Sequence, residues 1–221
     1  MSHFSVAVLT TDESLSVDEL LELYSAELTV APYLVYTKQE AIDEGRKLYP
    51  QSSDKERWEL ISEGYIIDKN GNLYSSDNPN GRWDWWIKGG RWENCLRLKN
   101  GTRADSAQIK DIDFNPDEKE YKKALRFWDI VVEHAPLKIC EEKPFSFYKE
   151  NYYREIYGDR ETYAKKQAQF YTYVVITPNG LWYEQNKDED LEWANNFVKD
   201  FIECEDPETV LTIVDCHMCH I

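Results

Sequence analysis

Short apolar runs predict strands at both ends of the chain. Residues 4–9 alternate in the manner of an opening strand, and residues 33–36 form a second apolar run. Residues 210–214 are apolar at nearly every position, which is typical of a buried strand. The two ends of the chain are therefore each expected to contribute a strand to the fold.

Capping residues mark where the first helices begin. Ser16 and Glu19 have the spacing of a capping box, in which each side chain binds the other residue's backbone amide. Thr37 repeats this pattern and begins a helix that runs to about residue 48, and a short helix is expected over residues 54–61. The apolar face of the first helix comprises Leu20, Leu21, Tyr24 and Leu28.

The second half of the chain predicts further helices. Asn115 is the expected N-cap of one helix, because Pro116 and two acids follow it. Residues 146–169 are expected to be helical on either side of Gly158, and Asp188 is expected to cap a last helix. The apolar faces of the Asn115 helix and of the last helix comprise Tyr121, Leu125, Trp128 and Val132, and Leu191, Ala194, Phe197, Val198 and Phe201.

Two Asn-Gly turns between apolar segments predict hairpins, within residues 65–74 and 173–183. Their similarity has two explanations: an internal duplication, or the same turn chemistry used twice, which we favour. Residues 100–114 and 135–145 are expected to be irregular connections. The hairpins favour an antiparallel sheet with helices mainly on one face. We therefore predict a single α+β domain over residues 1–221.

The charge balance narrows the range of partners. The 221 residues include 42 acids and 26 basic residues, which gives a net charge of −16. Such a charge disfavours duplex nucleic acid and anionic membranes, which both attract Lys and Arg. The opening residues lack a secretory signal, and no apolar run approaches the length of a spanning helix. We therefore expect a soluble cytoplasmic protein whose five cysteines are free thiols.

The most unusual segment is residues 77–92, where four of the eight tryptophans fall within ten positions. As a strand, it would place Trp83, Trp85 and Ile87 on one face and Asp84, Trp86 and Lys88 on the other. Gly89 and Gly90 permit a sharp bend or a close backbone approach. The tryptophans are Trp83, Trp85, Trp86 and Trp92.

The same region is a basic island in an acidic chain. Six basic residues against two acids give residues 82–103 a charge of +4, so the other 199 residues carry −20. Arginine forks bind phosphate, tryptophan faces stack on bases, and amides at a bend can bind an anion. The alternative is a structural cluster, since tryptophan usually fills cores and contacts arginine there. No known phosphate-binding motif is present.

The termini carry metal-capable residue types: His3, Asp215, Cys216, His217, Cys219 and His220. Cys216 to His220 also has the spacing of a c-type haem attachment site, but such attachment requires export. Residues 215–217 continue a predicted strand, where neighbours point to opposite faces and are poorly placed to share a metal. We therefore expect no metal and no cofactor. Asp215 and His217 remain a possible acid–base pair.

Three segments together resemble a known group of proteins: the opening Met-Ser-His-Phe, the central Asn-Pro-x-x-x-Trp-Asp-Trp-Trp-x-x-Gly-Gly-Arg-Trp, and the late Asp-Cys-His. The chain resembles a family of mostly uncharacterised accessory proteins of tailed bacteriophages. The resemblance implies a phage protein in the host cytoplasm that counters host defence. It also implies that the three segments meet around one site, although it assigns no catalytic residue.

Three functions are consistent with these observations. The leading hypothesis is a protein that binds and sequesters an anionic small molecule, such as a nucleotide-derived signal. The alternatives are an enzyme that acts on such a nucleotide, with or without a metal, and an acidic inhibitor of a host defence protein. The expected ligand-binding residues are Arg82, Trp83, Asp84, Trp85, Trp86, Lys88, Gly89, Gly90, Arg91, Trp92, His3 and His217.

Overall fold

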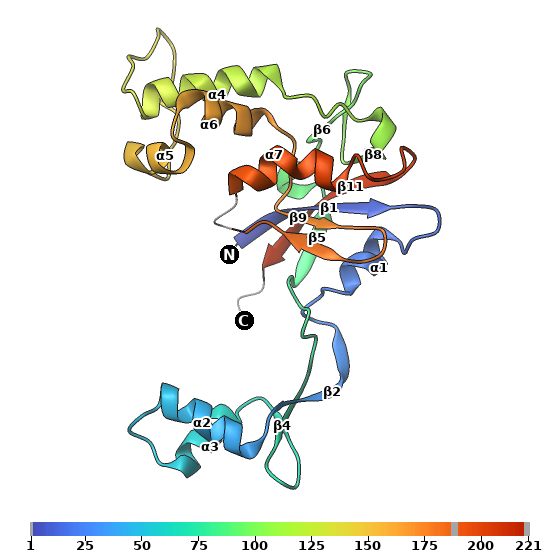
Figure 1. Ribbon diagram of the computed structural model, residues 1–221, viewed down its shortest axis with the longest axis vertical. Coiled ribbons are helices and arrows are strands. Elements are labelled where there is room, and N and C mark those ends of the chain that lie inside the picture. The colour runs from blue at the N-terminus through green and yellow to red at the C-terminus, as the bar shows by residue number, and fades with distance from the viewer. Residues whose placement is uncertain (1, 187–189, 219–221) are drawn as a thin grey trace. The chain divides into compact units, whose positions relative to one another are not determined.

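The chain belongs to the α+β class. The computed structural model describes residues 2–186 and 190–218 (Figure 1). The contacts between residues divide the chain into two compact units. The first unit comprises residues 2–20 and 86–217, and the second comprises residues 21–85 with residue 218. The single α+β domain that the sequence predicts over residues 1–221 stays a prediction.

The first unit is built on a six-stranded sheet. Its main path runs in the order β10-β9-β1-β11-β5, and β8 also pairs with β11. β1 lies parallel to β9 with Val6 opposite Val174, whereas β10 and β8 pair antiparallel with β9 and β11. The strands are β1 (Ser2–Thr10), β5 (Trp85–Lys88), β8 (Ser106–Gln108), β9 (Val174–Ile176), β10 (Trp182–Glu184) and β11 (Val210–Met218).

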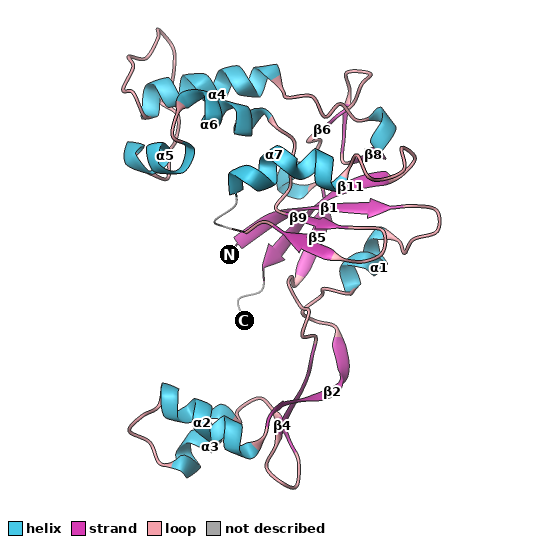
Figure 2. Cartoon of the chain, in the orientation of Figure 1, coloured by secondary structure: helices cyan, strands magenta, loops and turns pink. Residues whose placement is uncertain are grey.

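The core lies on both faces of this sheet. Neighbouring residues of β1 point to opposite faces, and Val6, Ala7, Val8 and Leu9 are all fully buried. On one face, Phe197 from α7 (Asp190–Phe201) packs in a cluster with Ala7, Leu9, Val175 and Ile213. Figure 2 shows α7, α6 and α4 on one side of the sheet, which confirms helices mainly on one face.

A second cluster joins the helices α4 (Glu118–Val131), α5 (Glu150–Tyr157) and α6 (Arg160–Ala168). Trp128, Tyr153 and Tyr163 are its largest buried side chains. Gly158 ends α5 with a φ of 72°, a conformation that favours glycine, so the predicted division of residues 146–169 is confirmed.

Several predicted element boundaries were wrong. The N-cap of α4 is Asp117, not Asn115, whose carbonyl and side chain bind Arg97 and Asp113. Helix α1 (Val17–Glu22) begins at the predicted capping box but ends before Tyr24. Residues 100–114 hold short strands rather than an irregular connection, since β7 (Arg103–Ala104) pairs with β6 (Leu96–Arg97) and β8 pairs with β11. The predicted cap Asp188 lies outside the described residues.

The second unit contains a three-stranded antiparallel sheet in the order β2-β4-β3 and a pair of helices. The predicted hairpin at Asn70-Gly71 is confirmed, as is the hairpin between β9 and β10 in the first unit. The elements are β2 (Thr29–Tyr36), α2 (Lys38–Leu48), α3 (Asp54–Ile61), β3 (Ile66–Ile67) and β4 (Leu73–Asp77).

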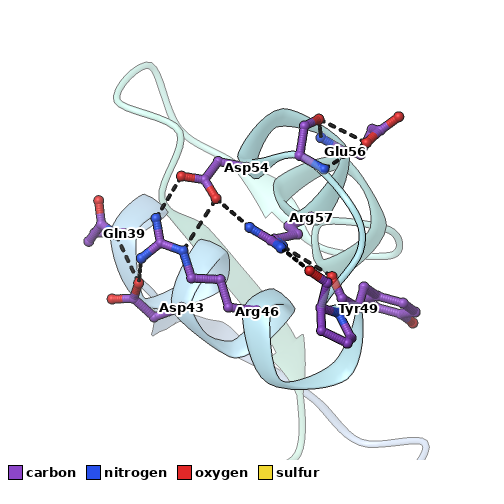
Figure 3. Close-up of polar contacts among 9 residues, drawn as sticks. Gln39, Asp43, Arg46, Tyr49, Asp54, Glu56 and Arg57 are labelled. Atoms are coloured by element: carbon purple, nitrogen blue, oxygen red, sulfur yellow. Dashed lines mark hydrogen bonds and ion pairs between the residues drawn. The ribbon is translucent and has the colours of Figure 1, made fainter.

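Ion pairs at the surface join α2 to α3 (Figure 3). Arg46 donates to Asp43 at 2.6 Å and to Asp54 on α3 at 2.6 Å. Arg57 donates to Asp54 at 2.7 Å and to the Tyr49 carbonyl at 3.1 Å. Because Arg46, Asp43 and Asp54 are about half exposed, these pairs are screened by solvent and contribute little to stability.

None of the described helices combines the length and the apolar character that crossing a membrane requires.

Candidate functional site

The two predicted terminal strands lie side by side at the centre of the sheet, and they bring His3 to Asp215. His3 Nδ1 lies 2.8 Å from Asp215 Oδ1, and the two side chains are only 10% and 3% exposed. Thr10 meets Val210 at the other ends of these strands, so β1 and β11 run in opposite directions. His217 lies two residues beyond Asp215, and its ring meets the His3 ring edge-on at 5.2 Å.

The Gly89–Gly90 turn closes over the same carboxylate. Arg91 N donates to Asp215 Oδ2 at 3.0 Å, and Gly89 N donates to the Ile213 carbonyl at 2.9 Å. Gly90 has a φ of +53°, and a Cβ built on it would lie 2.5 Å from Asp215 Cβ. A Cβ on Gly89 would lie 2.8 Å from the Asp105 carboxylate. Only glycine at both positions therefore allows this approach.

The amides of this bend were expected to receive the anion of a ligand, but they bind within the protein. Asp215 is the acceptor for Arg91 N, and the amides of Trp92 and Glu93 donate to the carbonyls of Gly89 and Gly90. The bend therefore binds the protein's own carboxylate. Through Asp215, the bend, β1 and β11 meet at one place, as the resemblance to the phage family implied.

Five of the six basic side chains of residues 82–103 divide into two groups. Arg97 pairs with Asp113 at 3.0 Å and Asp117 at 3.4 Å, and Arg103 reaches Asp117 at 3.5 Å. Lys99 donates to the Lys110 carbonyl at 2.5 Å. In contrast, Lys88 and Arg91 are exposed on either side of the turn, and neither forms an ion pair with any acid that the structure describes. These two cations are available to a ligand.

The tryptophans have three different surroundings. Trp83 is 5% exposed, and its indole N–H donates to the Leu21 carbonyl at 3.2 Å, so it is a core residue of the second unit. Trp85 is 45% exposed, which corrects the prediction that it shares a face with Trp83, because β5 begins only at Trp85. Trp86 and Trp92 are half-buried, and Trp92 packs against the core of the first unit.

The expected ligand-binding residues are therefore divided between the two units. Arg82, Trp83, Asp84 and Trp85 belong to the second unit, and the remaining eight belong to the first. Arg82 is exposed, and its backbone amide donates to the Tyr24 carbonyl. Within the first unit, the structure brings His3, Arg91 and His217 together around Asp215.

The geometry also changes the expected acid–base pair. The imidazole that binds Asp215 is His3, whereas the sequence suggested His217. A carboxylate at Nδ1 fixes the ring orientation and favours the tautomer with a proton on that nitrogen. Cys216 points to the opposite face of β11 from Asp215, and burial raises the pKa of its thiol. Among the described residues, no group of three His, Cys, Asp or Glu side chains is arranged to hold a metal. Cys219 and His220 lie outside them.

Sequence reasoning missed Asp105. This residue lies in the segment predicted to be irregular, yet its carboxylate accepts from Asn94 N and its backbone carbonyl accepts from Ile213 N. The two glycines signalled a close approach, but the approaching group depends on which strands pair.

No protein-family model, curated protein or solved structure shows a significant similarity to this chain.

Proposed function

We propose that the protein binds an anionic small molecule of the nucleotide-derived class at the Gly89–Gly90 turn. The observation that carries this proposal is the pair of exposed cations, Lys88 and Arg91, which lack ion-pair partners among the described residues. They lie in residues 82–103, which carry a net charge of +4 in a chain whose net charge is −16. A compact anion would pair with both cations there, while the acidic rest of the protein would repel a long polyanion.

The turn offers a rigid base for such binding. Its backbone is held by Asp215 and by the Ile213 carbonyl, so the Arg91 side chain projects from a fixed point. A guanidinium binds a phosphate through two parallel hydrogen bonds, and the lysine ammonium adds a second charge. The half-buried Trp86 would present its ring to a base.

The biological role that we propose is that of a phage accessory protein that sequesters a nucleotide signal of host defence. Two points support it. The Met-Ser-His-Phe, Trp-Asp-Trp-Trp-x-x-Gly-Gly-Arg-Trp and Asp-Cys-His segments resemble the phage family, and these segments contribute His3, Arg91 and Asp215 to one cluster.

Isothermal titration with cyclic nucleotides and ADP-ribose-type nucleotides tests the proposal. We expect at least one to bind, and we expect Arg91→Ala and Lys88→Ala each to weaken it about tenfold or more, because each removes a charged hydrogen bond. Lys122→Ala is the matched control, since Lys122 is an exposed lysine on α4. The absence of binding by every nucleotide, or unchanged binding by Arg91→Ala, would refute the proposal.

An enzyme acting on the same ligand is a second candidate, favoured by the hydrogen bond between His3 and Asp215. In that case His3 would transfer a proton and Asp215 would position its ring. Chromatography of the ligand after incubation separates the two functions. Intact ligand supports sequestration, whereas a product that disappears with His3→Gln supports the enzyme.

A further inference from the structure

The loop that joins α4 to α5 exposes five large apolar side chains within residues 137–148 (Figure 1). Ile139 is 98% exposed, Phe147 is 85% exposed and Phe145 is 75% exposed, and the two phenylalanine rings meet edge-on at 4.6 Å. Leu137 and Tyr148 are about half exposed. Because a large apolar side chain presents about 200 Å² when fully exposed, the five leave about 700 Å² in contact with water. Monomeric proteins rarely leave so much apolar surface uncovered in one region.

Hydrogen bonds hold this loop near both of its ends. Arg126 on α4 donates from Nε to Glu141 at 2.6 Å and from Nη2 to the Pro136 carbonyl at 2.9 Å. Towards the other end, the hydroxyls of Ser146 and Tyr153 lie 2.7 Å apart. The loop therefore presents its apolar side chains in a fixed arrangement, which lowers the entropy that a partner must remove on binding.

The same loop, together with α4 and α6, lines a cavity of about 320 Å³. A cavity of about 150 Å³ is enough for a benzene ring, so this one has room for a phenylalanine side chain. Pro144, one of its lining residues, directly precedes Phe145, so the cavity and the exposed rings belong to one stretch of chain. The other apolar lining residues are Ala124, Phe127, Ile130 and Tyr163.

These features fit a second copy of the chain. A two-fold interface uses the same patch on both copies, so that patch must offer both a projecting group and a recess. Residues 135–149 contain three lysines and two glutamates, a net charge of +1, whereas the whole chain carries −16. Two copies that meet here avoid the repulsion between acidic surfaces. Covering both patches would bury about 1,400 Å², within the roughly 1,200–2,000 Å² of specific interfaces.

We propose that the 137–148 loop is the interface of a two-fold symmetric dimer, in which Phe147 of each copy enters the cavity of the other. Ile139 and Phe145 are covered in the same contact. The dimer does not depend on an anion at the Gly89–Gly90 turn, so a failure of nucleotides to bind there leaves this proposal unaffected.

Analytical ultracentrifugation of the full chain tests the dimer. At about 50 µM we expect a particle with twice the mass of one chain. Ile139→Ser and Phe147→Ser should each weaken the dimer about tenfold or more, because a few covered apolar side chains carry most of the binding energy. Both side chains are exposed in the single chain, so neither variant should lose its fold, which circular dichroism checks. Leu48→Ser is the control, because Leu48 is an exposed apolar side chain in the second unit, and it should leave the dimer intact.

Photo-cross-linking tests which groups meet. With the photo-reactive benzoylphenylalanine in place of Phe147, irradiation should join two copies through residues of α4 or α6. Sodium chloride should strengthen the dimer, since it screens the repulsion between two acidic chains.

Four results would overturn the proposal: a monomer at the stated concentration, a dimer that Phe147→Ser leaves intact, cross-links that avoid α4 and α6, or a dimer that salt weakens. A monomer that floats with phosphatidylcholine vesicles, and no longer floats as Phe147→Ser, would assign the loop to a lipid surface instead.

Discussion

The basic side chains on the two sides of Trp92 have opposite surroundings. Lys88 and Arg91 precede it and project into solvent, while Arg97 and Arg103 follow it and are paired with acids. All four belong to the segment with a net charge of +4. The charge of a segment therefore does not show how much of it a ligand can use.

The two sides of Trp92 differ in how far the neighbouring acids are buried. Near the turn, Asp215 is bound by His3 and Arg91 N, and Asp105 is bound by Asn94 N, so backbone amides engage both carboxylates. Beyond Trp92, backbone amides also bind Asp113 and Asp117, but these side chains are 28% and 23% exposed and still pair with Arg97. Hydrogen bonds from Asn115, and then the charge of Arg97, lower the pKa of Asp113. Burial separates the two cases, because Asp215 is only 3% exposed and forms no ion pair with Arg91, whereas the part-exposed Asp113 and Asp117 reach a guanidinium.

The largest expected effect on stability comes from a substitution in the Gly89–Gly90 turn. Gly90→Ala places a Cβ against Asp215 at a positive φ, and we expect a loss of about 3 kcal/mol in the free energy of unfolding. Gly101→Ala is the control, because Gly101 also has a positive φ, +86°, but nothing lies within 4 Å of its added Cβ. That variant should lose only about 1 kcal/mol. Equal losses in urea unfolding would show that the contact with Asp215 does not constrain the turn.

Replacing a paired arginine and replacing an unpaired arginine should change the stability of the protein by different amounts. Arg97→Ala breaks the pairs with Asp113 and Asp117, which are less than a third exposed, and should cost about 1–2 kcal/mol. Arg91→Ala removes a solvated side chain and should change stability by less than about 0.5 kcal/mol. Urea unfolding of both variants measures the difference. If Arg91→Ala proves the more destabilising, its side chain has a structural role and the comparison fails.

The smallest expected effect is that of salt on the affinity for the ligand. An increase in sodium chloride of about tenfold is expected to weaken a phosphate ligand at Lys88 and Arg91 several-fold, since exposed charges are screened. Titrations at the two salt concentrations provide the test, and an unchanged affinity would argue that these two cations do not hold the ligand.

The sequence predicted those features that depend on near neighbours. The capping boxes at Thr37 and Ser53 are confirmed as starts of α2 and α3, although only the first was recognised in advance, and both Asn-Gly hairpins form. The meeting of His3, the Gly-Gly turn and Asp215 was also predicted, because the resemblance linked those segments. Features that depend on strand pairing were not. The short strand β8, the role of Asp105 and the burial of Trp83 all require knowledge of which distant segments meet.

The place of β11 in the sheet has a consequence for how the protein is made. This strand is central, with β1 on one side and β5 and β8 on the other, yet it comprises residues 210–218 and the ribosome makes it after all the other strands. Until it emerges, β1 has one unpaired side and Asp215 cannot reach His3 or the turn. The sheet can therefore be completed only after residue 210 has been translated, through contacts of high sequence separation, which form slowly. Nascent chains halted before residue 210 are therefore expected to expose apolar strand edges to chaperones and proteases.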